Sequence, residues 1–101
     1  MFKNILLGVD TQLTNEKALK EVSKLAGEGT VVTILNAISE QDAQASIKSG
    51  IHLDKLTEQR SKGLAPTRQA LEDYGIEYEE MIVRGNAKEK LVKQANSGKY
   101  D

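Results

Sequence analysis

The chain contains no cysteine and no tryptophan, and it has only one histidine, one proline and one phenylalanine. Without cysteine, neither a disulfide framework nor thiol chemistry is available. A single histidine, His52, also excludes the usual zinc sites, which take several Cys or His ligands at short spacing. The scarcity of aromatic side chains excludes a platform on which single-stranded bases would stack.

Long apolar runs and an excess of charge are absent as well. No run approaches ~18 apolar residues, and the N-terminal apolar stretch is short and ends in an acid, so the sequence predicts neither a membrane span nor a signal peptide. The expected compartment is therefore the cytoplasm. Lys and Arg number 14 against 15 Asp and Glu, for a net charge of −1. This balance argues against nucleic acid as a partner, because binding to phosphates needs a basic surface.

What the chain does have is a regular alternation of apolar runs and helical patterns over 101 residues, a length typical of one domain. Residues 5–9 and 31–38 are almost continuously apolar, as in strands covered on both faces of a parallel sheet, and residues 76–85 predict a third strand. A helical pattern follows each strand. The order strand–helix–strand–helix–strand–helix predicts a single α/β domain over residues 1–101, with a parallel sheet between helical layers.

Glycine, proline and capping residues locate the helix ends. Gly27 and Gly29 are a stop signal for the first helix, whereas residues 39–50 have little periodicity and predict a loop or a weak helix. Pro66 removes a helical hydrogen bond, so we expect a kink or break near residues 63–66. Asn86, with Glu89 three residues later, is a capping box that starts the last helix.

Several polar residues have an ordinary interpretation beside a functional one. His52 precedes a helix in a polar segment and has no chemical partner nearby, so we expect a solvated side chain rather than a catalytic one. Glu77, Glu79 and Glu80 could suggest an acidic metal site. Their place at the start of a peripheral strand more simply predicts edge protection and solubility.

In open parallel sheets, ligands bind at the carboxyl ends of the strands. Three segments therefore matter: residues 8–11, 36–38 and 84–86. Asp10 draws attention because a carboxylate at a strand end accepts hydrogen bonds from ribose hydroxyls or an adenine amino group. The alternative is that Asp10 begins a turn and accepts backbone amides, as Asp commonly does. Spacing alone favours the turn.

Taken together, several segments resemble the universal stress protein family. They are "KNILLGVD", "TNEKALKEVSKLA", "VVTILNAISE", "LEDYGIEYEEMIVRGNAKEKLVKQA" and the closing "SGKYD". The resemblance spans essentially all 101 residues. It implies a five-stranded parallel sheet of order 3-2-1-4-5 in a Rossmann-like, three-layer fold, a role in the stress response, and, for many members, binding of ATP or AMP.

The resemblance also implies site residues. Asp10 matches the acid at the end of the family's first strand, and Gly8 and Val9 match the preceding positions that line the adenosine pocket. Ala37 matches the small apolar residue of the second strand that packs on adenine. Given this resemblance, the two roles of Asp10, a nucleotide contact and a turn residue, are equally expected. The resemblance implies neither a metal nor a catalytic residue, and we expect no enzyme.

The sequence departs from the family pattern in one large respect. The glycine-rich signature Gly-x-x-Gly-x9-Gly-Ser/Thr, which binds phosphate and ribose after the fourth strand, does not occur in the 101 residues. We therefore expect a C-terminally incomplete domain with weak or undetectable ATP binding. The first strand is expected to lie at an exposed edge and to pair with another chain, giving a homo-oligomer.

Two functions remain open on these grounds. One is a stress-response regulatory module that binds adenine nucleotide. The other is an interaction or oligomerisation protein that binds no nucleotide and pairs through the exposed first strand. An enzyme is disfavoured because the sequence supplies no nucleophile–base pair and no paired carboxylates at a strand end.

Overall fold

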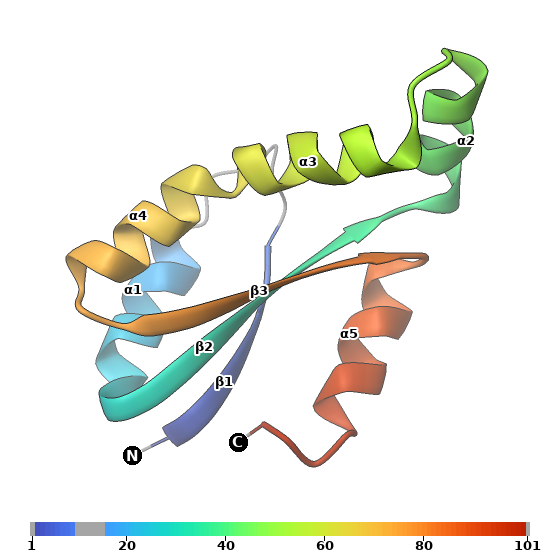
Figure 1. Ribbon diagram of the computed structural model, residues 1–101. Helices are drawn as coiled ribbons and strands as arrows, with labels where there is room; N and C mark the ends of the chain where they lie inside the picture. The colour runs from blue at the N-terminus through green and yellow to red at the C-terminus, as the bar shows by residue number, and fades with distance from the viewer. Residues whose placement is uncertain (1, 10–15, 101) are drawn as a thin grey trace.

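Three parallel strands form the centre of the molecule (Figure 1). The computed structural model describes residues 2–9 and 16–100. The sheet has the order β1 (Phe2–Gly8), β2 (Ala26–Ile38), β3 (Glu77–Arg84), with β2 paired to both neighbours. This order confirms the 3-2-1 part of the expected arrangement, with β1 at one edge.

Helices cover both faces of the sheet, which confirms the three-layer α/β/α fold. One face carries α1 (Glu16–Leu25), α3 (Leu53–Gly63) and α4 (Ala65–Asp73), with α2 (Glu40–Lys48) beyond the end of β2. The other face carries α5 (Ala87–Ala95), which packs on β1 and β2. The two crossovers from β1 to β3 advance in one direction across the sheet, so right-handed connections place their helices on one face. After β3 the chain turns back, and α5 therefore takes the opposite face.

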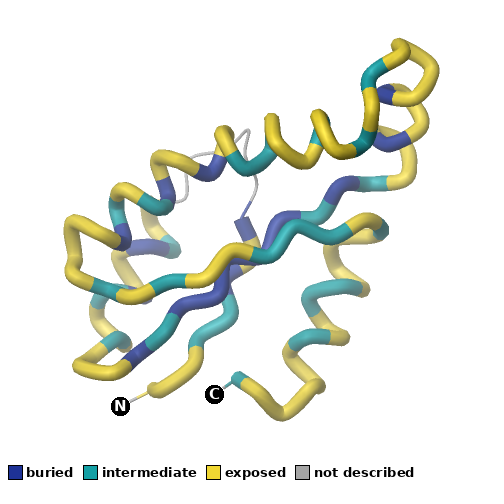
Figure 2. Tube along the Cα trace, in the orientation of Figure 1, coloured by how far each residue is buried: buried dark blue, intermediate teal, exposed yellow. Residues whose placement is uncertain are grey.

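The core lies between β2 and the helices of the first face, as Figure 2 shows. Its fully buried side chains are Val32, Ile34, Leu64 and Leu71. Continuous apolarity in residues 31–38 thus reflects a strand covered on both faces. Neither α3 nor α5 contains a fully buried residue, so both helices are held mainly by partly buried contacts.

The start of β2 differs from the expectation. The strand begins at Ala26, directly after α1, rather than at residue 31. Thr30 Oγ1 donates to the carbonyl of Phe2 and accepts from the amide of Gly27 at 2.9 Å, which ties the glycine-containing segment to β1. Gly29 has φ +83°, and the pairing register shifts between Phe2 and Asn4. The glycines therefore accommodate an irregular strand rather than a loop.

The segment between β2 and β3 contains three helices. Residues 40–48 form a true helix because Ser39 caps it, accepting from the amide of Asp42 at 3.1 Å. The break expected near Pro66 is confirmed, since α3 ends at Gly63 and α4 begins at Ala65 with the proline in its first turn. His52 caps α3 and its side chain is 81% exposed, in agreement with the solvated residue expected.

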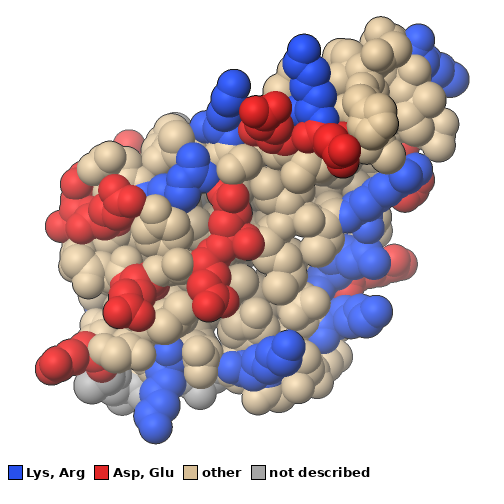
Figure 3. Space-filling model, in the orientation of Figure 1, with Lys and Arg blue, Asp and Glu red and all other residues tan. Residues whose placement is uncertain are grey.

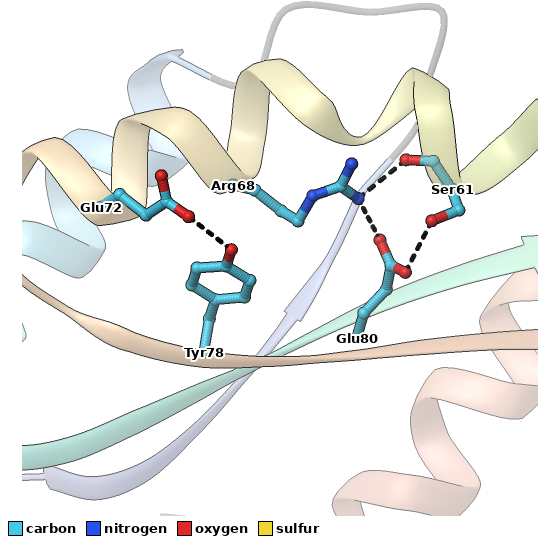
Figure 4. A network of polar contacts seen from close by, with 5 residues as sticks. All are labelled: Ser61, Arg68, Glu72, Tyr78 and Glu80. Carbon is cyan, nitrogen blue, oxygen red and sulfur yellow. Dashed lines mark hydrogen bonds and ion pairs between the residues drawn. The ribbon is translucent and has the colours of Figure 1, made fainter.

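A polar network ties the edge strand β3 to α3 and α4 (Figure 4). Arg68 donates to a carboxylate oxygen of Glu80 and, at 2.7 Å, to the carbonyl of Ser61, while the Ser61 hydroxyl donates to the other Glu80 oxygen at 2.9 Å. The Tyr78 hydroxyl donates to Glu72 at 2.7 Å, and this bond raises the pKa of Tyr78. The interpretation of Glu80 as simple edge protection was therefore wrong, because its carboxylate bridges two helices.

Arg68→Met is expected to lower the free energy of unfolding by about 1–2 kcal/mol, because it removes charge-assisted hydrogen bonds between side chains that are each only 26% exposed. Lys24→Met is the matched control, since the Lys24–Glu21 pair is more than half exposed and is worth less than about 0.5 kcal/mol. Urea unfolding of both variants measures the difference. Equal losses would show that the network contributes no more than a surface pair.

Candidate functional site

A cleft of about 490 Å³ opens at the carboxyl ends of β1 and β2. Its walls come from these strand ends, from Asp42 of α2 and Arg60 of α3, and from the first turns of α5. The position follows from the packing of α5 on β1 and β2, which brings its first turns to the carboxyl ends of these strands. Open parallel sheets bind ligands at the carboxyl ends of their strands.

Small side chains keep the floor of the cleft open. Gly8 ends β1, and a Cβ atom at this position would lie 3.4 Å from Leu91 Cδ2 of α5. Ala37 and Leu35 line the same cleft from β2. Because strand residues alternate between faces, Gly8, Leu35 and Ala37 lie on the α5 side of the sheet. The floor is therefore apolar, with room for a flat ring between strand ends and helix.

The end of β1 is fixed by hydrogen bonds to β2. The amide of Val9 donates to the carbonyl of Leu35 at 2.9 Å, and Asn36 Nδ2 donates to the carbonyl of Val9 at 2.8 Å. Val9 and Asn36 are both buried and both line the cleft. These bonds hold the strand end, and hence the cleft wall, in one conformation.

The wall of the cleft that α2 and α3 provide carries two opposite charges that neutralise each other. Arg60 and Asp42 form an ion pair with 2.6 Å between Nη2 and Oδ2, and the Arg60 side chain is 17% exposed. The helix that bears Asp42 is itself anchored to β3, because Arg84 donates twice to the Glu40 carboxylate at 3.0 Å. Among the described residues, Lys88 also lines the cleft.

Asn86 and Gly85 fix the start of α5 against the carboxyl ends of the strands. Asn86 Oδ1 accepts from the amide of Glu89 at 3.0 Å, as the capping-box spacing predicts. Gly85 before it has φ +132°, and a Cβ there would lie 2.7 Å from Lys90 Cε. The Lys90 side chain could move aside, but the positive φ strains any residue other than glycine, so Gly85 fixes where α5 begins and where Ala87 and Lys88 meet the cleft.

The structure brings together three of the four residues that the resemblance implied. Gly8, Val9 and Ala37 all line the cleft. Asp10 lies outside the described residues. Sequence reasoning missed the Asp42–Arg60 pair because the two residues are 18 positions apart and lie on different helices. It also did not single out Asn36, although the strand-end segment 36–38 was recognised as a ligand-binding position.

Two further findings concern residues 2–9 and 16–100. In this part of the chain no three His, Asp or Glu side chains gather into a metal-binding group. No helix there is both long and apolar enough to span a bilayer.

Comparison with known proteins agrees with this architecture. No curated protein matches the chain. Among solved structures, the chain is similar to hypothetical protein MJ0577, the subject of a structure-based assignment of biochemical function, at 30% identity and a TM-score of 0.80. The match covers 100% of this chain and 71% of that one. A model of the universal stress protein family matches residues 1–101. The chain therefore belongs to the universal stress protein family.

Proposed function

We propose that this domain is a stress-response regulatory module that binds an adenine nucleotide weakly, through its nucleoside part, in the cleft at the ends of β1 and β2. Family membership supports a function of the stress-response type. The observation that carries the nucleotide proposal is the convergence of Gly8, Val9 and Ala37 on one cleft. The module acts by binding and not by catalysis.

The shape of the cleft suits the base of a nucleoside. A purine is flat and largely apolar on its faces, and the floor offers the small side chains of Gly8 and Ala37 beside Leu35 and Leu91. Ligand pockets of this kind are mostly apolar with a few polar groups that fix orientation. The polar residues Asn36, Asp42, Arg60 and Lys88 also line the cleft.

By comparison, the described lining of the cleft offers little positive charge to bind a phosphate. Among the described residues that line it, the charged groups are Asp42, Arg60 and Lys88. Arg60 is already paired with Asp42, whose carboxylate repels a phosphate. Figure 3 shows Lys and Arg side chains gathered on the side where α5 lies, but exposed lysines add little affinity at physiological salt. We therefore expect the nucleoside to contribute most of the binding free energy.

Calorimetric titration with adenosine and with ATP tests this proposal. We expect dissociation constants weaker than about 100 µM for both ligands, within about fivefold of each other, since one tenfold step is 1.4 kcal/mol. A micromolar constant for ATP, far below that for adenosine, would show that this chain binds phosphate strongly. The absence of binding by either ligand at millimolar concentration would refute the proposal itself.

A second candidate is self-association through β1. Within the part of the chain that the structure describes, β1 is an edge strand of the sheet, with β2 as its neighbouring strand. An edge strand is a template for pairing with another chain, and we propose that a second copy of this chain pairs along residues 5–8. Sedimentation velocity should then show a dimer. A monomer at high concentration would contradict this candidate and leave the nucleotide proposal untouched.

A further inference from the structure

The Asp42–Arg60 ion pair lies in the wall of the cleft, where it is accessible to a ligand. Both residues are among those that line the cleft. The Asp42 side chain is 53% exposed, whereas the Arg60 side chain is 17% exposed. Of the two charges, the carboxylate is therefore the more accessible to a ligand in the cleft.

The backbone that carries this carboxylate is held by two sets of contacts at the start of α2. The amide of Asp42 donates to Ser39 Oγ at 3.1 Å. Two residues before Asp42, the carboxylate of Glu40 accepts two hydrogen bonds from Arg84, both at 3.0 Å. The start of α2 is thus anchored to β3, which keeps Asp42 beside Arg60 of α3.

The pairing matters because a guanidinium is well suited to bind phosphate, having planar donors and a permanent charge. Arg60 would supply such a group to the cleft, but its charge is neutralised by Asp42. Among the described residues that line the cleft, Asp42 is the acid beside the bases Arg60 and Lys88. A phosphate has to approach this carboxylate, whereas an uncharged nucleoside meets no such repulsion.

We propose that Asp42 is a specificity-determining residue whose carboxylate occupies Arg60 and thereby weakens binding of the phosphates of a nucleotide. Binding of the nucleoside part does not depend on this charge. The inference rests on the proposed function, because it concerns the ligand of the same cleft. It assigns to one side chain the poor phosphate affinity of the described lining, and it follows that neutralising Asp42 releases Arg60 for phosphate.

The test compares adenosine with ATP in the wild type and in Asp42→Asn. Asparagine keeps the size of the side chain and the backbone bond to Ser39, and it removes the charge. Calorimetric titrations at one low ionic strength, without divalent cations that would neutralise the phosphates, should show ATP bound about tenfold more tightly by the variant. Adenosine should be bound within about twofold of the wild type. The double variant Asp42→Asn, Arg60→Gln should lose the gain, because Arg60 is the group that takes the phosphate.

Glu40→Gln is the matched control, since it removes one negative charge from the same helix at a residue that is absent from the cleft lining. It should leave the ratio of the two affinities unchanged, and circular dichroism verifies that all variants fold. An equal gain in Glu40→Gln would show an effect of net charge alone, and a gain that persists in the double variant would show that Arg60 takes no part. Either result overturns the inference.

The remaining outcomes separate the inference from the proposed function. If the wild type binds adenosine and Asp42→Asn does not change the ratio of ATP to adenosine affinity, the inference alone is wrong. If neither the wild type nor Asp42→Asn binds adenosine or ATP at millimolar concentration, the proposed function falls and the inference falls with it.

Discussion

Replacement of Ile34 by Ala is expected to lower the free energy of unfolding by about 2–5 kcal/mol, since it leaves a cavity in a core that cannot fully collapse around it. Ile34 has no exposed surface and lies on β2, the strand that pairs with both neighbours. Small domains are stable by only about 5–15 kcal/mol, so this one substitution removes a large part of the total.

Ile47→Ala is the control for that result. It deletes the same atoms from α2, where the side chain is 48% exposed, and should cost less than about 1 kcal/mol. Urea unfolding with a common m-value compares the two variants. Similar losses for Ile34 and Ile47 would contradict the placement of the core between β2 and the helices of the first face.

Replacement of Ala37 by Phe is expected to weaken adenosine and ATP binding by about tenfold or more. The added ring occupies the floor of the cleft, where the base would otherwise pack, and a tenfold loss corresponds to about 1.4 kcal/mol. Ala37 is only partly buried, so the ring can extend into the open cleft without disrupting the core. The substitution should therefore reduce binding with little change in the unfolding midpoint.

Ala45→Phe provides the matched control, because Ala45 is exposed on α2 and is not among the residues that line the cleft. Competition titrations by ligand-observed NMR measure both variants against the wild type. Unchanged binding by Ala37→Phe, with the fold intact, would place the nucleotide somewhere other than this cleft.

The fold could be predicted largely because its signals are local. Continuous apolarity marked β2 as a covered strand, Pro66 marked the break between α3 and α4, and Asn86 marked the start of α5. The helix at residues 40–48 was ambiguous because its pattern is weak and only the Ser39 cap fixes its start. Gly27 and Gly29 correctly marked the end of the first helix, but the early start of β2 at Ala26 was missed because an irregular strand can contain such glycines.

The candidate site was predictable only in part, for a physical reason. Gly8, Val9 and Ala37 end neighbouring strands, and strand ends of a parallel sheet meet by topology alone. The Arg60–Asp42 pair depends on how α2 and α3 pack, which no local pattern encodes. The hydrogen bond from Asn36 Nδ2 to the carbonyl of Val9 likewise joins two segments that only the folded chain brings together. Glu80 was misjudged for the same reason.

The most direct test of the central claim is a titration of ATP into ¹⁵N-labelled protein, followed by amide chemical shifts. Weak binding does not prevent this measurement, because fast exchange reports each perturbed amide. The account predicts saturable shifts at Gly8, Val9, residues 35–37 and the first turns of α5, with little change along the outer side of α4. Shifts confined to another surface, or none at millimolar ATP, would contradict it.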